Sequence, residues 1–462
     1  TLPPPPRSTL LPSTTLFRSD MQRWKNAIGG YPLWFVSSLF ALSKLCHFLF
    51  FCSIYKFESH YDCVFDKSNE LLYLEIKKTN GYQLLSEFFL NKYFVYLSSW
   101  DTHHYIKNIV LTITNDNKNK LYSENSMVFS PFVWCKLLSC WLLYIPSEYW
   151  LHLLFIINNA ISYVQVIVFY QLLSLCGQNT FRAVLTTSMF IFNISGIFQT
   201  TFYAENLSVL VIFVGLYLRL LMLKRQKSFL FYVISLPVFA LSVLNRPNCL
   251  IVGLLYVYDV IYFFASYQPL RATAVIMQGI MLGLVAFFFL FSLPDKMFCE
   301  RSEFSWCVNS RDHCFKLLSI TINVRLPMFY SYLQSKYWNV GLFKYYTINN
   351  LPNFLLAFPQ TAVITASIMY KFNNTINRQF IDSLKLVAIA LLFTVYTVAH
   401  VQIINRISNI VAPLWFSYIL EVLLQDVKSS KMARFIVLSY LTFNTIYWIV
   451  QAYLFLCFLP PA

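Results

Sequence analysis

Residues 203–227 read YAENLSVLVIFVGLYLRLLMLKRQK, and this stretch decides the fold. Between the polar group at Glu205 and the cations that follow Leu223, almost every residue is apolar. A run of about 20 apolar residues is long enough to cross a bilayer as an α-helix, and a helix satisfies its own backbone polar groups without water. The stretch therefore predicts a membrane-spanning helix over residues 206–223.

The composition of the whole chain extends this prediction. Of the 462 residues, 58% are hydrophobic and 12% are charged, and the mean hydropathy is +0.56. A soluble protein with this composition would lack the polar residues that its surface needs. We therefore expect an all-α polytopic membrane protein. It has about eleven spans, at residues 33–53, 150–175, 183–201, 206–223, 228–245, 249–266, 273–293, 351–370, 384–401, 408–425 and 435–457.

The basic loops predict the orientation of these spans. The loop cations are Lys224-Arg225-Gln226-Lys227, Lys371 with Arg378, and Lys428 with Lys431 and Arg434. All three loops fall on one side, which the positive-inside rule places in the cytoplasm. The long polar segments 54–130 and 294–350 then share the luminal side. The formal charge of +15 is spread over short loops and forms no basic stripe, so no nucleic-acid partner is expected.

These boundaries divide the chain into six parts. Residues 1–20 have neither the apolar core of a signal peptide nor a helical period, and we expect them to be a non-native or disordered leader ahead of Met21. The stretch 131–145 contains Lys136 and stops at Pro146, and the sequence leaves open whether it crosses, re-enters or lies in the interface. After residues 1–20, the other five parts follow in order. The first is the cytoplasmic end with the first span, which acts as an uncleaved signal anchor (21–53). The others are the first luminal loop (54–130), a transmembrane bundle (131–293), the second luminal loop (294–350) and a C-terminal transmembrane bundle (351–462).

Cysteine and histidine usage predicts no metal site. The loop cysteines Cys63, Cys299, Cys307 and Cys314 leave the presence of a disulfide open, since an oxidising lumen would permit one. His103 and His104 are adjacent, so they point in different directions on a helix or a strand and make a poor shared pair of ligands. No metal or other cofactor is expected.

Polar side chains gather at the predicted luminal ends of the spans, where a membrane protein places them at a cost. Each group also has an explanation that involves no function. Carboxylates in loops are commonly solvated, and aromatic runs anchor a protein in the membrane interface. Arginines near span ends extend their side chains to the same interface. Taken as one site, carboxylates that accept a proton and arginines that bind phosphate favour sugar transfer from a lipid phosphate to a hydroxyl. The groups are Trp100-Asp101 with Glu124, Tyr203-Ala204-Glu205-Asn206, Asn245-Arg246-Pro247-Asn248, Tyr337-Trp338-Asn339-Val340-Gly341 with Lys344, and His400-Val401-Gln402 with Arg406.

At these residues the chain resembles the PIG-V family, the GPI mannosyltransferase II enzymes of the endoplasmic reticulum. The first-loop signature is Trp100-Asp101-Thr102-His103-His104-Tyr105-Ile106, with Glu124 and Phe129-Ser130-Pro131 downstream. The block from Tyr337 to Tyr346, followed by Leu351-Pro352-Asn353-Phe354, is the most specific match. The resemblance covers roughly residues 33–460. The departures are Ser130, Ala204 and Pro247 in family motifs and an Asn- and Lys-rich stretch at about 108–120.

The resemblance implies a GT-C glycosyltransferase whose active site lies at the luminal membrane surface. The family transfers the second mannose of the GPI core, in α1,6 linkage, from dolichyl-phosphate-mannose to the first mannose of the precursor. In fungi a small membrane subunit is expected as a partner.

We interpret Asp101 as the general base of an inverting single displacement. Arg246, His400 and Arg406 are the candidates for holding the dolichyl phosphate. Glu124, a second catalytic candidate, and Glu205 would orient the acceptor or support the cations. The further binding candidates are Trp100, Asn248, Trp338, Asn339, Lys344 and Gln402.

Two other classes of protein remain open. A transporter also places charged groups inside a helical bundle, but transporters often contain internal repeats and bind near the bilayer midplane. This sequence shows no repeat and has its polar groups at span ends. A non-catalytic subunit of a membrane complex would not need Asp101.

Overall fold

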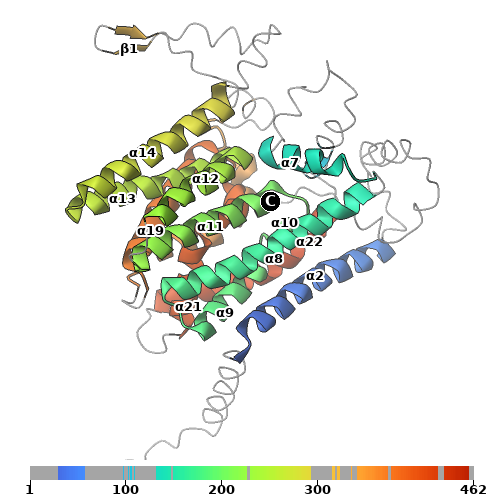
Figure 1. Cartoon of the computed structure of the whole chain (residues 1–462). Helices are drawn as coiled ribbons and strands as arrows, with labels where there is room; N and C mark the ends of the chain where they lie inside the picture. Colours follow the sequence, from blue (N-terminus) through green and yellow to red (C-terminus); the bar gives the residue numbers. More distant parts are fainter. Residues whose placement is uncertain are drawn as a thin grey trace, which may run out of the picture.

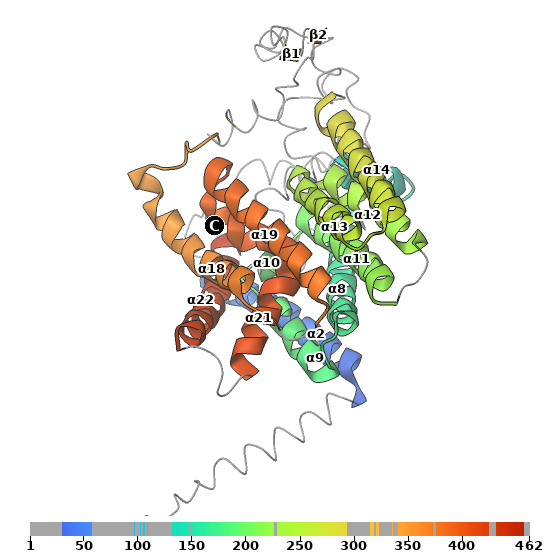
Figure 2. The same ribbon diagram turned by 90° about the vertical axis from the view of Figure 1, so that its left-hand side faces the viewer.

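A computed structural model describes a large part of the chain. The described residues are 30–57, 97, 102, 105–106, 109, 132–146, 149–225, 229–292, 315–317, 320–322, 335, 341–372, 376–424 and 431–456. Within these ranges the protein is a bundle of helices (Figures 1 and 2). The one exception there is a short antiparallel pair, β1 (Phe315–Leu317) and β2 (Ile320–Ile322). The predicted all-α polytopic class is therefore confirmed.

Nine of the described helical segments are long and apolar enough to cross a membrane. Two shorter apolar helices, α9 and α12, also fall where spans are predicted, so the count of about eleven crossings stays a prediction. The helices are α2 (Pro32–Phe57), α7 (Phe132–Leu142), α8 (Trp150–Cys176), α9 (Thr180–Ile191), α10 (Gly196–Thr200), α11 (Ala204–Arg225), α12 (Leu230–Asn245), α13 (Leu254–Ala265), α14 (Pro269–Ala286), α18 (Leu351–Met369), α19 (Arg378–Val398), α20 (Ile404–Ile407), α21 (Ala412–Leu424) and α22 (Lys431–Leu456). Short 3-10 turns precede α13, α18, α20 and α21.

The prediction of one continuous span over residues 183–201 is wrong. Helix α9 ends at Ile191, and α10 begins only at Gly196. Asn444 accounts for the break, because its Nδ2 donates to Phe192 O (2.8 Å) and its Oδ1 accepts from Ile194 N (2.8 Å). Irregular backbone is tolerated at membrane depth only where protein buries it and satisfies its polar groups. The break is therefore stabilised by a side chain that is distant in the sequence.

The sequence leaves open whether residues 131–145 cross the membrane, and helix α7 lies in this stretch. It has 11 residues, which at 1.5 Å per residue is about 16 Å, roughly half the thickness of the hydrocarbon core. It packs against α12. This length favours the interfacial or re-entrant alternative over a full crossing.

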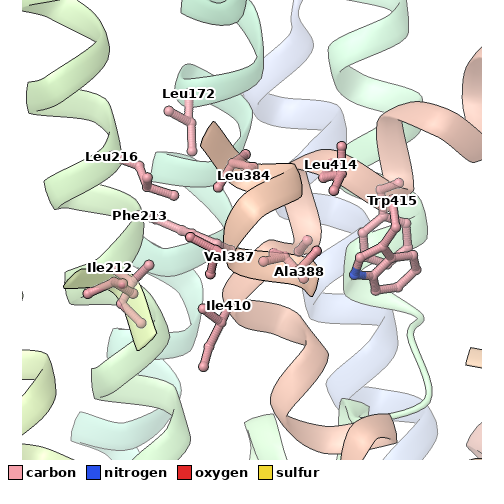
Figure 3. Packing of buried hydrophobic residues seen from close by; sticks show 14 of the residues in the cluster. Leu172, Ile212, Phe213, Leu216, Leu384, Val387, Ala388, Ile410, Leu414 and Trp415 are labelled. Atoms are coloured by element: carbon pink, nitrogen blue, oxygen red, sulfur yellow. The ribbon is translucent and has the colours of Figure 1, made fainter. Parts of the chain in front are cut away.

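The core of the bundle lies around α11 and α21. One buried apolar cluster includes Phe213 and Leu216 of α11, Val387 of α19 and Leu414 of α21 (Figure 3). A glycine permits the closest approach of two helices here, because a Cβ on Gly215 of α11 would collide with an aromatic ring of α12. Dense packing of this kind fixes the relative positions of the helices.

A buried ion pair joins four helices inside the bundle. Arg219 of α11 donates from Nε and Nη2 to the two carboxylate oxygens of Asp259 in α13, both at 2.6 Å. Tyr232 of α12 donates to Asp259 Oδ2 (2.6 Å), and Gln379 of α19 donates to Oδ1 (3.4 Å). Arg219 and Asp259 are almost completely buried. The pair therefore fixes α11, α12, α13 and α19 at one level of the bundle.

The ends of the helices separate into two groups. Lys224, at the end of α11, donates to Leu175 O near the end of α8 (2.8 Å). The Asn377 N–H, just before α19, donates to Cys176 O (3.0 Å). Arg182 at the start of α9 pairs with Glu421 near the end of α21. The described helix ends that flank the basic loops thus lie together at the end of the bundle opposite Glu205. The assignment of that end to the cytoplasm stays a prediction.

The ion pair predicts a specific stability effect. Asp259→Leu removes the carboxylate and leaves the charge of Arg219 buried, so we expect a loss of about 3–5 kcal/mol. The folded fraction of detergent-solubilised protein after graded heating measures it. The double variant Arg219→Leu/Asp259→Leu is the control, because removing both charges is expected to recover much of the loss. Unchanged heat resistance of Asp259→Leu would contradict a role of the pair in holding the helices together.

Candidate functional site

Glu205 lies at the centre of a charged cluster at one end of the bundle. It occupies the first turn of α11, where the helix dipole favours an anion. Its Oε1 accepts from Arg246 Nη2 and lies 2.8 Å from Arg406 Nε. The three side chains are largely buried, with exposed fractions of 10% for Glu205, 18% for Arg246 and 16% for Arg406. One carboxylate thus joins two guanidinium groups from segments far apart in the sequence.

Arg406 is also held by aromatic rings. Its guanidinium carbon lies 5.1 Å from the ring centroid of Phe198 and 5.3 Å from that of Tyr203, distances at which a cation is attracted to a ring face. Phe198 belongs to α10, and Tyr203 immediately precedes α11. The broken segment described above therefore forms one wall of the charged cluster.

Arg246 connects the cluster to the first-loop motif. It is the C-terminal cap of α12 and has an extended backbone, as expected for a residue followed by Pro247. Its Nη1 donates to the hydroxyl of Tyr105 (3.1 Å). Thr102 Oγ1 donates to Phe202 O (3.3 Å), and the rings of Tyr105 and Tyr203 meet edge to face at 6.1 Å. Tyr105 of the Trp100–Ile106 motif thus contacts the cluster, and Thr102 contacts the segment that borders it.

Side-chain amides hold the backbone around Glu205. Asn245 Nδ2 donates to Ala204 O and to Ser208 Oγ, both at 2.8 Å. Asn206 Nδ2 donates to Asn158 Oδ1 (3.1 Å) and to the carbonyls at 198 and 199 (3.2 Å each). These amides are buried, so they satisfy backbone groups that water does not reach. They fix the backbone position of Glu205.

A second polar group surrounds Tyr345. The His400 ring stacks on the Tyr345 ring, with centroids 4.5 Å apart and an interplanar angle of 22°. The Tyr345 hydroxyl donates to Gln402 Oε1 (2.7 Å) and accepts from Asn353 Nδ2 (2.6 Å). Burial raises the pKa of Tyr345, and the hydrogen bonds with Gln402 and Asn353 lower it by less. The phenol therefore keeps its proton at neutral pH and remains a donor.

Of the predicted site residues, several are described and fall into these groups. Glu205, Arg246 and Arg406 come together, whereas His400 packs on Tyr345 together with Gln402. Lys344 Nζ donates to Ser335 Oγ (3.2 Å), and Asn248 Oδ1 accepts from the Cys249 thiol (3.9 Å). The predicted residues outside the described ranges are Trp100, Asp101, Glu124, Trp338 and Asn339, together with His103, His104 and the loop cysteines Cys63, Cys299, Cys307 and Cys314.

Among the described residues, no group of three or more His, Cys, Asp or Glu side chains is placed to hold a metal ion. Within the part of the chain that the structure describes, the charges gathered at Glu205 are its own carboxylate and the guanidiniums of Arg246 and Arg406. Such a group suits recognition of anionic and hydroxyl-bearing ligands, because guanidinium groups bind phosphate oxygens in a forked geometry.

Sequence reasoning missed the charged and polar residues inside the spans. Arg219 and Asp259 interrupt predicted spans, and so do Lys44 and His47 in the first one. A search for ionisable residues within apolar runs finds all four, because such residues are rare in membranes and mark sites or structural pairs.

The helical bundle and its charged end define a polytopic membrane protein with a buried carboxylate–arginine site at one end of its helices. A family profile described as Mannosyltransferase (PIG-V) matches residues 46–387. The chain belongs to this family, and it is therefore a glycosyltransferase. The resemblance on which the sequence prediction rested is confirmed.

Individual relatives agree with the family profile. Three similar proteins are each described as GPI mannosyltransferase 2. The one from Eremothecium gossypii is 31% identical over 80% of this chain and 89% of its own length. Those from Candida glabrata and Saccharomyces cerevisiae are 32% and 30% identical, each over 86% of this chain and over 93% and 94% of their own lengths. No solved structure shows a significant match.

The shared carboxylate predicts a large effect on catalysis. Glu205→Gln keeps the shape of the side chain but leaves Arg246 and Arg406 without their common anion. We expect mannose transfer per folded molecule to fall about 100-fold, as when a preorganised charged contact is lost from an active site.

Transfer activity, normalised to correctly folded protein in membranes, measures this effect. Asp382→Asn is the matched control, since it makes the same carboxylate-to-amide change in a half-exposed pair with Arg378 at the opposite end. Activity of Glu205→Gln within about twofold of the unaltered protein would exclude Glu205 from the site.

Proposed function

We propose that this chain transfers the second mannose of the glycosylphosphatidylinositol core. The donor is dolichyl-phosphate-mannose, the acceptor is the first mannose of the GPI precursor, and the new linkage is α1,6. The reaction takes place at the luminal face of the endoplasmic reticulum membrane. The family and the name of its relatives, GPI mannosyltransferase 2, support the choice of acceptor pathway.

The observation that carries the proposal is the contact between the first-loop motif and the charged cluster. Arg246 binds both Glu205 and the hydroxyl of Tyr105, so a motif from the long polar segment contacts one of the two arginines. Asp101 directly precedes Thr102 in the chain. The Thr102 hydroxyl donates a hydrogen bond to Phe202 O, close to the start of α11. Two guanidiniums suit the phosphate of a sugar donor. A carboxylate from the neighbouring motif suits the attacking hydroxyl.

The proposed chemistry is a single displacement with inversion. The 6-hydroxyl oxygen of the acceptor mannose attacks the anomeric carbon of the donor mannose, and its proton passes to Asp101. The bond between the anomeric carbon and the phosphate oxygen breaks as the new bond forms. Dolichyl phosphate leaves with the bonding electron pair, and a β-linked donor gives an α-linked product without a covalent enzyme intermediate.

Arg246 and Arg406 have the roles of binding the donor phosphate and of stabilising the negative charge that grows on it. A guanidinium presents its N–H donors in a planar fork that matches the oxygens of a phosphate. Glu205 holds both guanidiniums in fixed positions, which reduces the reorganisation required at the moment of reaction. Glu124 remains the second catalytic candidate. The candidates for binding sugar and lipid are Trp100, Asn248, Trp338, Asn339 and Lys344.

In this proposal the residues around Tyr345 form a polar wall that contacts the sugar. Tyr345, His400 and Gln402 come from the YWNVG block and from the segment after α19. A stacked aromatic pair with fixed hydrogen-bonding groups presents a flat apolar face beside polar atoms, which suits a sugar ring. His400 packs on Tyr345 within this group, and its role in holding the dolichyl phosphate stays a prediction.

The placement of the charged cluster favours an enzyme over a transporter. Transporter sites commonly lie near the bilayer midplane between repeats, whereas Glu205 and Arg246 lie at the start of α11 and the end of α12. The proposal further includes the GT-C class and a small membrane subunit as partner.

The test is an in vitro transfer assay with dolichyl-phosphate-mannose and a one-mannose GPI precursor. We expect the unaltered chain to form the two-mannose product and Asp101→Asn to lose at least about 100-fold in rate, because the amide cannot accept the proton. Asp116→Asn, the same change in the Asn- and Lys-rich part of the first loop, is the matched control and should keep its rate.

Two outcomes would overturn the proposal in different ways. Failure of the unaltered chain to use this donor and acceptor, with a competent preparation of the relative from Saccharomyces cerevisiae in parallel, would exclude the reaction. Normal transfer by Asp101→Asn at equal protein levels would retain the reaction and exclude Asp101 as its base.

A further inference from the structure

The first span carries a polar face that its role as a membrane anchor does not require. Ser43, Lys44 and His47 lie near the middle of the span Pro32–Ser53, and Ser43 and His47 are buried. A lysine near the middle of a membrane helix is costly, so it marks a site or a structural partner by default. The helix α2 lies at one edge of the bundle beside α8 and α9 (Figure 1).

The polar face of α2 binds the short helix α10. Lys44 Nζ donates to Gln199 O (3.1 Å) and to Thr200 Oγ1 (3.0 Å). His47 Nδ1 is hydrogen-bonded to the same Thr200 hydroxyl (2.8 Å). A cation at the carbonyl end of a helix is also favoured by the dipole. Two side chains of the first span therefore meet at one hydroxyl.

The other sides of α10 are also held by polar groups and close packing. From α8, Asn159 Nδ2 donates to Thr200 O (3.3 Å) and Asn158 Nδ2 donates to Thr201 O (2.6 Å). From α22, the Trp448 indole lies so close to Gly196 that any Cβ there would collide with it. Lys44 thus supplies the cationic member of a set of contacts that fixes a single helical turn.

The turn so fixed lies directly against the charged cluster. Phe198, within α10, and Tyr203, just after it, are the two rings that flank the Arg406 guanidinium. Phe202 O accepts the hydrogen bond from Thr102 of the first-loop motif. A displacement of α10 would therefore move both the rings on Arg406 and the anchor of that motif.

The geometry points to Lys44 as a positioning residue for donor binding. By holding α10 through Gln199 O and Thr200, Lys44 fixes Phe198 and Tyr203 and thereby the place of Arg406. The identification of the affected ligand as the sugar donor rests on the proposed function, in which Arg406 binds the donor phosphate. The first span then contributes to the active site as well as to membrane insertion.

An apolar residue would serve insertion better than lysine at this depth. Transfer of a lysine to the centre of a spanning helix is unfavourable. In this protein, hydrogen bonds from Lys44 to Gln199 O and Thr200 Oγ1 offset that cost. A purely structural contact would affect how much protein folds. A positioning contact affects how well the folded protein binds one of its substrates, and this difference makes the inference testable.

The principal variant is Lys44→Met, which keeps most of the length and apolar volume of the side chain and removes the ammonium group. In the transfer assay we expect the KM for the donor to rise about tenfold, which is the lower end of the effect of losing a hydrogen bond to a charged group. The KM for the acceptor should stay unchanged. A smaller number of folded molecules would lower the maximal rate and shift neither KM.

Three further variants sharpen the test. Lys44→Arg keeps a cation and should restore the donor KM to within about threefold. Thr200→Val removes the hydroxyl that Lys44 and His47 share and should reproduce the donor KM effect, with the double variant no worse than either single one. Ser38→Ala is the matched control on the same helix, because the Ser38 hydroxyl donates within α2 to Trp34 O.

A readout independent of activity is amide hydrogen exchange followed by mass spectrometry. In Lys44→Met we expect faster exchange in a peptide covering residues 196–203 and unchanged exchange in a peptide covering α13. Ser38→Ala should change neither peptide.

Unchanged exchange at 196–203 together with an unchanged donor KM would overturn the inference and leave the proposed function intact. If exchange rises but both KM values stay the same, the link from α10 to donor binding is excluded. If the unaltered chain does not transfer mannose at all, the proposed function fails. The exchange measurement then still decides whether Lys44 holds α10.

Discussion

The contact on which the charged end of the bundle depends is the sharing of Glu205 between Arg246 and Arg406. It joins the start of α11, the end of α12 and the segment before α21. Removing one partner from a largely buried ion cluster leaves a charge without compensation, which costs several kcal/mol. The position of each of these helix ends is therefore set by the other two. The bundle brings the three ends together, and the carboxylate fixes their separation.

The membrane explains why amides and hydroxyls surround this cluster. The chain between α9 and α11 is irregular apart from the single turn of α10, so its backbone groups need partners other than those of a continuous helix. Asn158, Asn206 and Asn444 supply them from three helices. An irregular segment held in this way presents Phe198 and Tyr203 to Arg406 in a geometry that a straight helix would not give. The polar interior thus follows from a broken span beside a site.

The sequence predicts the spans well because length and apolarity are local properties of each segment. It also singles out Glu205, Arg246 and Arg406, which the structure brings together, because each stands out against apolar neighbours. Their role as the site stays a prediction. The sequence does not predict the break after Ile191, because Asn444, which stabilises it, lies far along the chain. The partners of Lys44, Arg219 and Asp259 escape prediction for the same reason: periodicity reveals a face of a helix, but pairing depends on how separate helices pack.

The two ionic contacts of α11 act together on the geometry of the site. Arg219 binds Asp259 and, through it, Tyr232 of α12 near one end of the helix, while Glu205 binds Arg246 of α12 at the other end. Two neighbouring helices that are tied at both ends cannot slide or rotate past each other without breaking a charged contact. The close approach at Gly215 between these ties leaves little room for side-chain adjustment. Arg246 is therefore held in place by contacts within the protein. The role proposed for it at the donor phosphate requires such preorganisation, because preorganised charges act most strongly on a transition state.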